Sequence, residues 1–115
     1  MFVQAYRDIT ADDQGKERSN EREIISMTIA RMVACDTNPN DGLARVKTIH
    51  FVKDVWTYFM NDLASSENAM PTELKASLFS LGIFVLKHLQ RMRDETDAKF
   101  APLIEISETI KKGLD

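Results

Sequence analysis

Apolar residues recur at helical spacing in four segments of this chain, and the third segment is apolar almost all the way round. That segment, residues 76–86, reads A-S-L-F-S-L-G-I-F-V-L and lacks a charged face. A helix without a polar face has to be surrounded by other helices, so we expect it at the centre of the fold. The next segment, residues 102–114, is apolar along one narrow edge only and therefore needs a partner for that edge.

The first helix is predicted from Asn20 onward. Asn20 can cap a helix, and Glu23 stands three residues later, as a capping box requires. The polar residues 11–19 are expected to form a solvated lead-in or a frayed first turn, and residues 1–19 as a whole a mobile N-terminal segment. The apolar stripe behind the cap consists of Ile25, Ile29, Met32 and Val33, broadened by Ile24 and Met27.

The second helix is predicted to follow the turn D-T-N-P-N-D-G, residues 36–42, because proline, glycine and short polar residues break helices. It should begin at Asp41 or Gly42 and end near Leu63. A stripe of apolar residues at spacings of three and four supports this assignment: Ile49, Val52, Trp56, Phe59 and Leu63.

Local signals also bound the last two helices. Thr72 is predicted to cap the third helix, in which Gly82 lets a neighbouring helix approach closely. Pro102 suits the first turn of the fourth helix, where its missing N–H costs nothing, and Gly113 suits its end. The sequence therefore predicts an all-α fold, a compact bundle of about four helices with short loops.

Length, composition and charge narrow the class of protein. A chain of 115 residues with 43% hydrophobic and 29% charged residues suits a single domain, residues 1–115. The single cysteine, Cys35, precludes an internal disulfide and fits a reducing compartment. With no export signal and no apolar run long enough to cross a bilayer, we expect a cytoplasmic protein without a membrane anchor. A net charge of −3 disfavours nucleic-acid binding, which usually requires a basic surplus.

No candidate reaction centre emerges from the polar residues. The turn at residues 36–42 departs from a calcium loop, because the twelfth position is Lys47 rather than a bidentate glutamate. His50 and His88 stand alone on separate helices and are interpreted as residues of the core edge or the surface. Cys35 is interpreted as a small buried residue. We therefore expect neither an enzyme nor a bound metal or cofactor.

Several segments taken together resemble a known family. The order W-x-x-F-x-x-D, then N-x-x-P, then the apolar helix, then L-I-x-I-x-x-x-I-x-x-G-L is similar to FlaF, the flagellar biosynthesis regulator of alphaproteobacteria. The residues at the motif positions are Trp56, Phe59, Asp62, Asn68, Pro71, Leu74, Leu103, Ile104, Ile106, Ile110, Gly113 and Leu114. An N-terminal A-Y pair, Ala5 and Tyr6, adds to the resemblance.

The resemblance implies a small cytoplasmic protein that binds flagellin and promotes its synthesis or secretion. It also implies a functional link to a second regulator, FlbT, as a candidate partner. Flagellin would be held as an amphipathic segment in an apolar groove, with the chain acting as an export chaperone. The residues predicted to contact flagellin are Tyr6, Ile25, Ile29, Met32, Leu103, Ile106, Ile110 and Leu114.

Two alternatives stay open at this point. The chain could bind flagellin mRNA as a post-transcriptional regulator, through Lys87, Arg91, Lys111 and Lys112. It could instead be a self-associating structural protein in which residues 102–115 close a homodimer.

Overall fold

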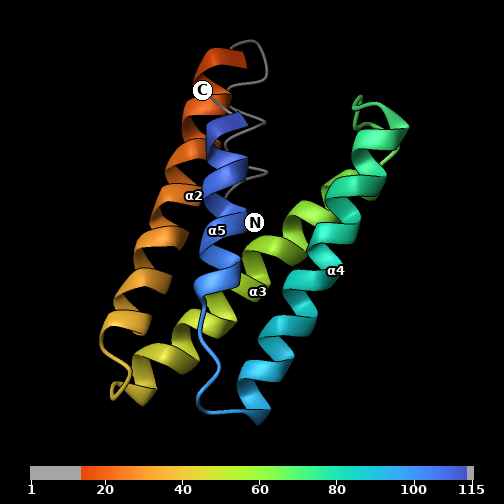
Figure 1. Ribbon diagram of the computed structural model, residues 1–115. Helices are drawn as coiled ribbons and strands as arrows, with labels where there is room; N and C mark the ends of the chain where they lie inside the picture. Colours follow the sequence, from red (N-terminus) through yellow and green to blue (C-terminus); the bar gives the residue numbers. More distant parts are fainter. Residues whose placement is uncertain (1–13, 114–115) are drawn as a thin grey trace. The chain divides into compact units, whose positions relative to one another are not determined.

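A computed structural model describes residues 14–113 of the chain, with side chains from residue 20 onward. Over this range the chain forms four α-helices and no strand, so the predicted all-α fold is confirmed. The helices are α2 (Gln14–Thr37), α3 (Gly42–Ala64), α4 (Thr72–Asp94) and α5 (Ala101–Gly113) (Figure 1). They form two compact units, one made of α3 and α4 and the other of α2 and α5.

In the first unit, α3 and α4 run antiparallel and pack through apolar stripes (Figure 1). The predicted close approach at Gly82 is confirmed. A Cβ atom added to Gly82 would lie 2.6 Å from Met60 Sδ and 2.8 Å from Met60 Cγ. Any larger residue at this position would therefore displace Met60. The buried residues of the two helices are Thr48, Ile49, Val52, Val55, Trp56 and Leu63 of α3 and Gly82, Val85, His88, Leu89 and Met92 of α4.

The link between α3 and α4 is tied back by side chains. Asn68 Nδ2 donates a hydrogen bond of 3.1 Å to Asp62 Oδ2, and Asn68 Oδ1 accepts one of 3.0 Å from the Met70 backbone N–H. Such an Asx turn fixes the backbone just before Pro71, which cannot continue a hydrogen-bonded turn. The chain therefore enters α4 at a defined angle.

In the second unit, α5 lies antiparallel beside α2 (Figure 1). Met32 of α2 and Leu103 of α5 are almost completely buried, as is Phe100, the residue that precedes α5. The Phe100 N–H donates a hydrogen bond of 3.0 Å to Asp36 Oδ1 at the last turn of α2. The C-terminal helix is therefore part of a packed core.

The structure corrects two predicted helix starts. Helix α2 begins at Gln14 instead of following a cap at Asn20, because the polar residues ahead of Asn20 include the good helix formers Gln, Lys, Glu and Arg. Pro71, not Thr72, occupies the N-cap position of α4 and offers no side-chain hydrogen bond. In contrast, α3 begins at Gly42, one of its two predicted starts, and Asp41 caps it: the Asp41 carboxylate accepts a hydrogen bond of 3.0 Å from the Ala44 N–H.

The third segment is not surrounded on every side. Phe79, Ile83 and Phe84 of α4 are exposed, so one face of this apolar helix meets solvent. Ser77 and Ser80 are exposed on the same side of α4, and these two polar residues are the sequence signal for its exposed face. Among the helices of residues 14–113, none combines the length and hydrophobicity that crossing a bilayer demands.

Candidate partner-binding surfaces

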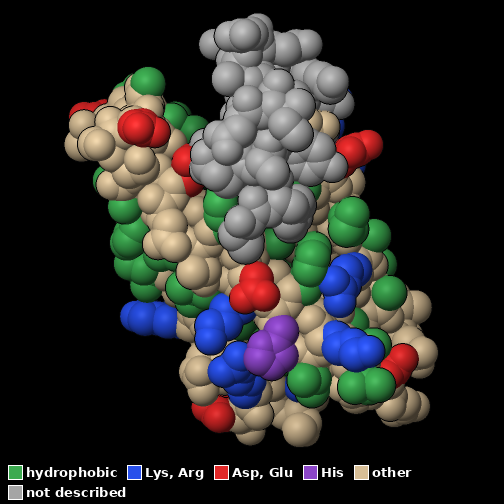
Figure 2. All heavy atoms as spheres, turned by 180° about the vertical axis from the view of Figure 1, so that it is seen from behind, with side chains coloured by type: hydrophobic (Ala, Val, Ile, Leu, Met, Phe, Trp, Pro, Cys, Tyr) green, Lys and Arg blue, Asp and Glu red, His purple; other side chains and the backbone are tan. Residues whose placement is uncertain are grey.

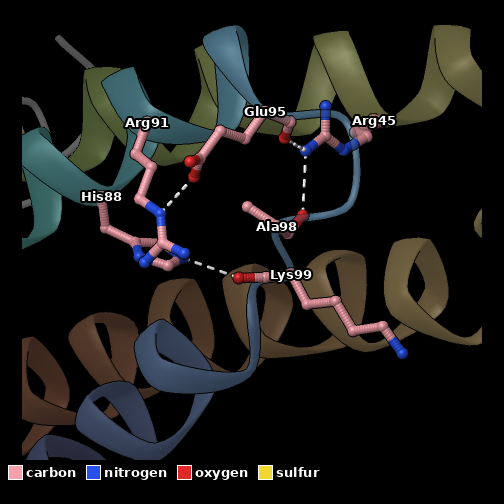
Figure 3. Close-up of polar contacts among 6 residues, drawn as sticks. All are labelled: Arg45, His88, Arg91, Glu95, Ala98 and Lys99. Atoms are coloured by element: carbon pink, nitrogen blue, oxygen red, sulfur yellow. Dashed lines mark hydrogen bonds and ion pairs between the residues drawn. The ribbon is translucent and has the colours of Figure 1, made fainter.

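The loop between α4 and α5 is held in place by one arginine. Arg45 on α3 donates from Nη2 to the carbonyl oxygens of Glu95, at 3.1 Å, and Ala98, at 2.9 Å (Figure 3). Both acceptors are backbone atoms, so their positions depend on the course of the loop. A guanidinium is suited to this role because it presents several N–H donors in a rigid plane.

Two side chains of α4 contact the same loop. His88 Nε2 lies 2.6 Å from the Lys99 carbonyl oxygen, which can only accept, so this nitrogen carries the hydrogen (Figure 3). Arg91 Nε forms a hydrogen-bonded ion pair with the Glu95 carboxylate. That hydrogen bond and the negative charge of Glu95 raise the pKa of Arg91. The loop therefore has a defined conformation, and the polar groups of His88 and Arg91 form contacts that maintain it.

One candidate surface lies on α2. Met27 is 55% exposed and Val33 is 43% exposed, and Ala30 and Ala34 beside them are exposed as well. These four residues, which we call the outer face of α2, follow one another at intervals that place them on neighbouring turns of one side. Figure 2 shows one side of the molecule, on which hydrophobic side chains reach the surface among charged ones. Exposed apolar groups in a contiguous patch are typical of binding surfaces.

A second candidate surface lies on α4. Phe79 is 39% exposed, Ile83 is 41% exposed and Phe84 is 47% exposed. Small residues occur on the same side of the helix, with Glu73 at one end and Lys87 at the other. We define the α4 face as the exposed residues Glu73, Ala76, Ser77, Phe79, Ser80, Ile83, Phe84 and Lys87.

The residues predicted to contact a partner divide into three groups. Ile25, Met32 and Leu103 are buried, so their side chains serve the core of the α2–α5 unit in this structure. The half-buried residues are Ile29, Ile106 and Ile110. Tyr6 and Leu114 lie outside the described residues. Partner binding by the half-buried group stays a prediction. The exposed Met27 and Val33 belong to the same predicted stripe but were not among the residues predicted to contact flagellin.

The four basic residues considered for RNA binding do not lie together in the sequence or in one unit. Lys87 and Arg91 lie on α4, whereas Lys111 and Lys112 lie in the last turn of α5. Among residues 14–113 there is no group of three or more His, Cys, Asp or Glu side chains that could hold a metal ion. Cys35 is buried, as its interpretation as a core residue predicts.

Comparison with protein families gives one match. The family model described as "Flagellar protein FlaF" matches residues 2–114, nearly the whole chain. The chain belongs to the FlaF family. Searches among curated proteins and among solved structures gave no significant match. The predicted family is thereby confirmed, and with it a role connected with the flagellum.

The structure explains several positions of the FlaF-like pattern in this chain. Asp62 and Asn68, which belong to separate motifs in the sequence, share a hydrogen bond that anchors the α3–α4 link. Trp56 and Phe59 of the first motif pack edge to face, with ring centroids 6.2 Å apart and planes at 88°. These residues therefore maintain the α3–α4 unit, and their presence says little about where a partner binds.

Proposed function

We propose that this FlaF-family chain binds flagellin and acts as its export chaperone, promoting flagellin synthesis and secretion from the cytoplasm. The proposal involves binding only, with no bond made or broken. Membership of a flagellar family over residues 2–114 is the observation that carries it. The apolar surface of the α2–α5 unit supplies a physical means of binding.

The outer face of α2 is the docking surface that we favour. Its four residues are apolar and exposed, and Ile29 at its border is half-buried. An amphipathic helix lays its apolar stripe on such a surface through side chains at i, i+3, i+4 and i+7. Met27 has a flexible, polarisable side chain that adapts to different neighbours. The half-buried Ile106 and Ile110 of α5 are candidates to extend the contact within the same unit.

Binding of this kind should be moderate in strength. A loose terminal segment of flagellin would have to become ordered, which costs about 2–5 kcal/mol of the gross interaction energy. We therefore expect a dissociation constant in the micromolar range, about 1–10 μM. Such a complex can form and dissociate quickly, as export requires.

Co-purification with full-length flagellin tests the proposal. The folded wild-type chain should retain flagellin, and titration with labelled flagellin terminal peptides should identify the segment that is bound. Met27→Glu and Val33→Glu should each weaken binding about tenfold or more, because each places a charge in an apolar contact. Both residues are exposed, so circular dichroism should show the wild-type helix content and thermal transition.

A matched control lies on another helix. Leu43 of α3 is exposed to an even greater extent than Met27, and Leu43→Glu should leave flagellin binding unchanged. If all three variants bind like the wild type, the outer face of α2 is not the docking surface. If the folded wild-type chain retains no flagellin at all, the chaperone proposal itself is wrong.

A further inference from the structure

We propose that the α4 face is a self-association surface, at which a second copy of this chain packs antiparallel about a two-fold axis near Ser80. In a two-fold interface each residue lies opposite the residue at the same distance on the other side of the axis. Ser80 therefore faces its own copy. The sequence on either side of Ser80 determines whether such a contact is self-complementary.

Charge complementarity is the first argument for this arrangement. Glu73 lies seven residues before Ser80 and Lys87 lies seven residues after it. Antiparallel pairing places Glu73 of each copy opposite Lys87 of the other, so the interface contains two ion pairs of opposite sign. Within one chain these two residues are about four helical turns apart, so they cannot form an ion pair with each other.

Size complementarity is the second argument. Phe84 lies four residues after Ser80 and faces Ala76, which lies four residues before it; Ile83 faces Ser77 in the same way. Ile83 and Phe84, two of the large exposed apolar side chains, therefore each meet a small one. Small residues at the crossing point let two helix backbones approach closely, and the apolar side chains of Ile83 and Phe84 then cover the gap on either side. All of these residues are exposed in the single chain.

A contact through one helix is small, so the dimer should be weak. Interfaces below about 1,200 Å² of total buried surface belong to transient complexes. We expect sedimentation velocity of the full chain to show a monomer at low micromolar concentration and a growing dimer fraction above about 50 μM. Phe84→Glu should weaken association at least about tenfold, because it removes the largest apolar contact and adds a charge.

A charge-reversal cycle tests the pairing directly. Glu73→Lys alone and Lys87→Glu alone should each weaken dimerisation about three- to tenfold, since each brings like charges together twice. The double variant E73K/K87E should restore wild-type association. Disulfide capture gives a second readout: Ser80→Cys should form a covalent dimer under mild oxidation, whereas Gln90→Cys, exposed on the same helix but ten residues from the two-fold axis, should not.

The results of these experiments either support or overturn self-association through the α4 face. Restored association in the double variant, with selective capture at position 80, supports it. A wild-type chain that stays monomeric at several hundred micromolar overturns it, as does equal capture at positions 80 and 90. A monomeric chain whose flagellin binding is lost in Phe84→Glu would assign the α4 face to flagellin instead and would also overturn self-association. The proposed chaperone role is tested separately, through Met27 and Val33.

Discussion

Asp36 and Phe100 are 64 positions apart in the sequence, yet the carboxylate of one accepts a hydrogen bond of 3.0 Å from the backbone N–H of the other. Asp36 is at the last turn of α2, and Phe100 immediately precedes α5. The N–H groups at a helix start have no partner within the helix, and a negative charge there is favoured by the helix dipole. This hydrogen bond therefore fixes where α5 begins on α2.

Loss of the Asp36 carboxylate should loosen α5. We expect Asp36→Ala to lower the free energy of unfolding by about 1 kcal/mol, the usual cost of removing a side-chain cap. Urea denaturation measures the loss, and hydrogen exchange should show faster exchange in residues 100–106.

The conservative variant separates hydrogen bonding from charge. Asp36→Asn keeps an acceptor oxygen and should retain at least half of the stabilisation. Glu108→Ala, which removes an exposed carboxylate of α5, should leave the stability close to wild type. An Asp36→Ala protein as stable as the wild type, with α5 exchanging no faster, would contradict this account.

The contact between Gly82 and Met60 should reverse the usual effect of replacing a helical glycine. In an uncrowded helix Gly→Ala stabilises by about 1 kcal/mol. Here the new methyl group would lie 2.6 Å from Met60 Sδ, and overpacking typically costs about 1–3 kcal/mol. We therefore expect Gly82→Ala to destabilise the protein by about 1 kcal/mol.

A double-mutant cycle checks the cause. In a Met60→Ala background the obstruction is gone, so Gly82→Ala should become stabilising by about 0.5–1 kcal/mol. The same destabilisation in both backgrounds would show that crowding by Met60 is not responsible.

Local sequence signals predicted the features that depend on neighbouring residues. The start of α3 at Gly42 and the position of Pro102 in the first turn of α5 were predicted correctly, because short-range chemistry determines each one. The close approach at Gly82 was also predicted, although the residue that it meets, Met60, could not be named. The predicted start of α2 was wrong, because the hydrophobic pattern does not extend to the true start of the helix. Hydrophobic periodicity marks the buried part of a helix, and the polar turn ahead of Asn20 lacks that periodicity although its residues favour helix.

Features that join distant parts of the chain could not be predicted. Nothing in the sequence near Arg45 indicates that it contacts a loop about fifty residues away, and the same is true of Asp36. The exposure of Phe79 and Phe84 was missed because a largely apolar helix was assumed to be surrounded. Ser77 and Ser80 were the available signal, since their spacing places them on one side of α4.

The link between α3 and α4 should be sensitive to charge. Asn68→Ala removes the hydrogen bonds to Asp62 and to the Met70 N–H, and should cost about 1–2 kcal/mol. Asn68→Asp should cost more at neutral pH, because it places a second carboxylate beside Asp62. The difference between the two variants should shrink when the salt concentration rises from about 0.05 M to 1 M, since salt screens like charges. Equal costs at low salt would contradict the pairing of these side chains.

The most informative test of the loop concerns Arg45. Arg45→Ala removes both hydrogen bonds to the carbonyl oxygens of Glu95 and Ala98, and should destabilise the fold by about 1.5–3 kcal/mol, as for hydrogen bonds from a charged group. Arg45→Lys should recover part of this, because an ammonium group lacks the planar fork of donors. Hydrogen exchange should locate the effect in residues 95–100.

The ion pair between Arg91 and Glu95 in the same loop provides the control for Arg45. Both side chains are largely exposed, at 63% and 48%, so solvent screens their attraction and Arg91→Ala should change the stability little. Because Glu95 raises the pKa of Arg91, any stabilisation by this pair is present near neutral pH and, on the alkaline side, is lost only when strong alkali deprotonates the arginine. Between about pH 6 and pH 9 the variant and the wild type should therefore differ by a constant amount. If Arg91→Ala loosened the loop as much as Arg45→Ala, charge at the surface, and not the hydrogen bonds to the backbone, would be holding residues 95–99.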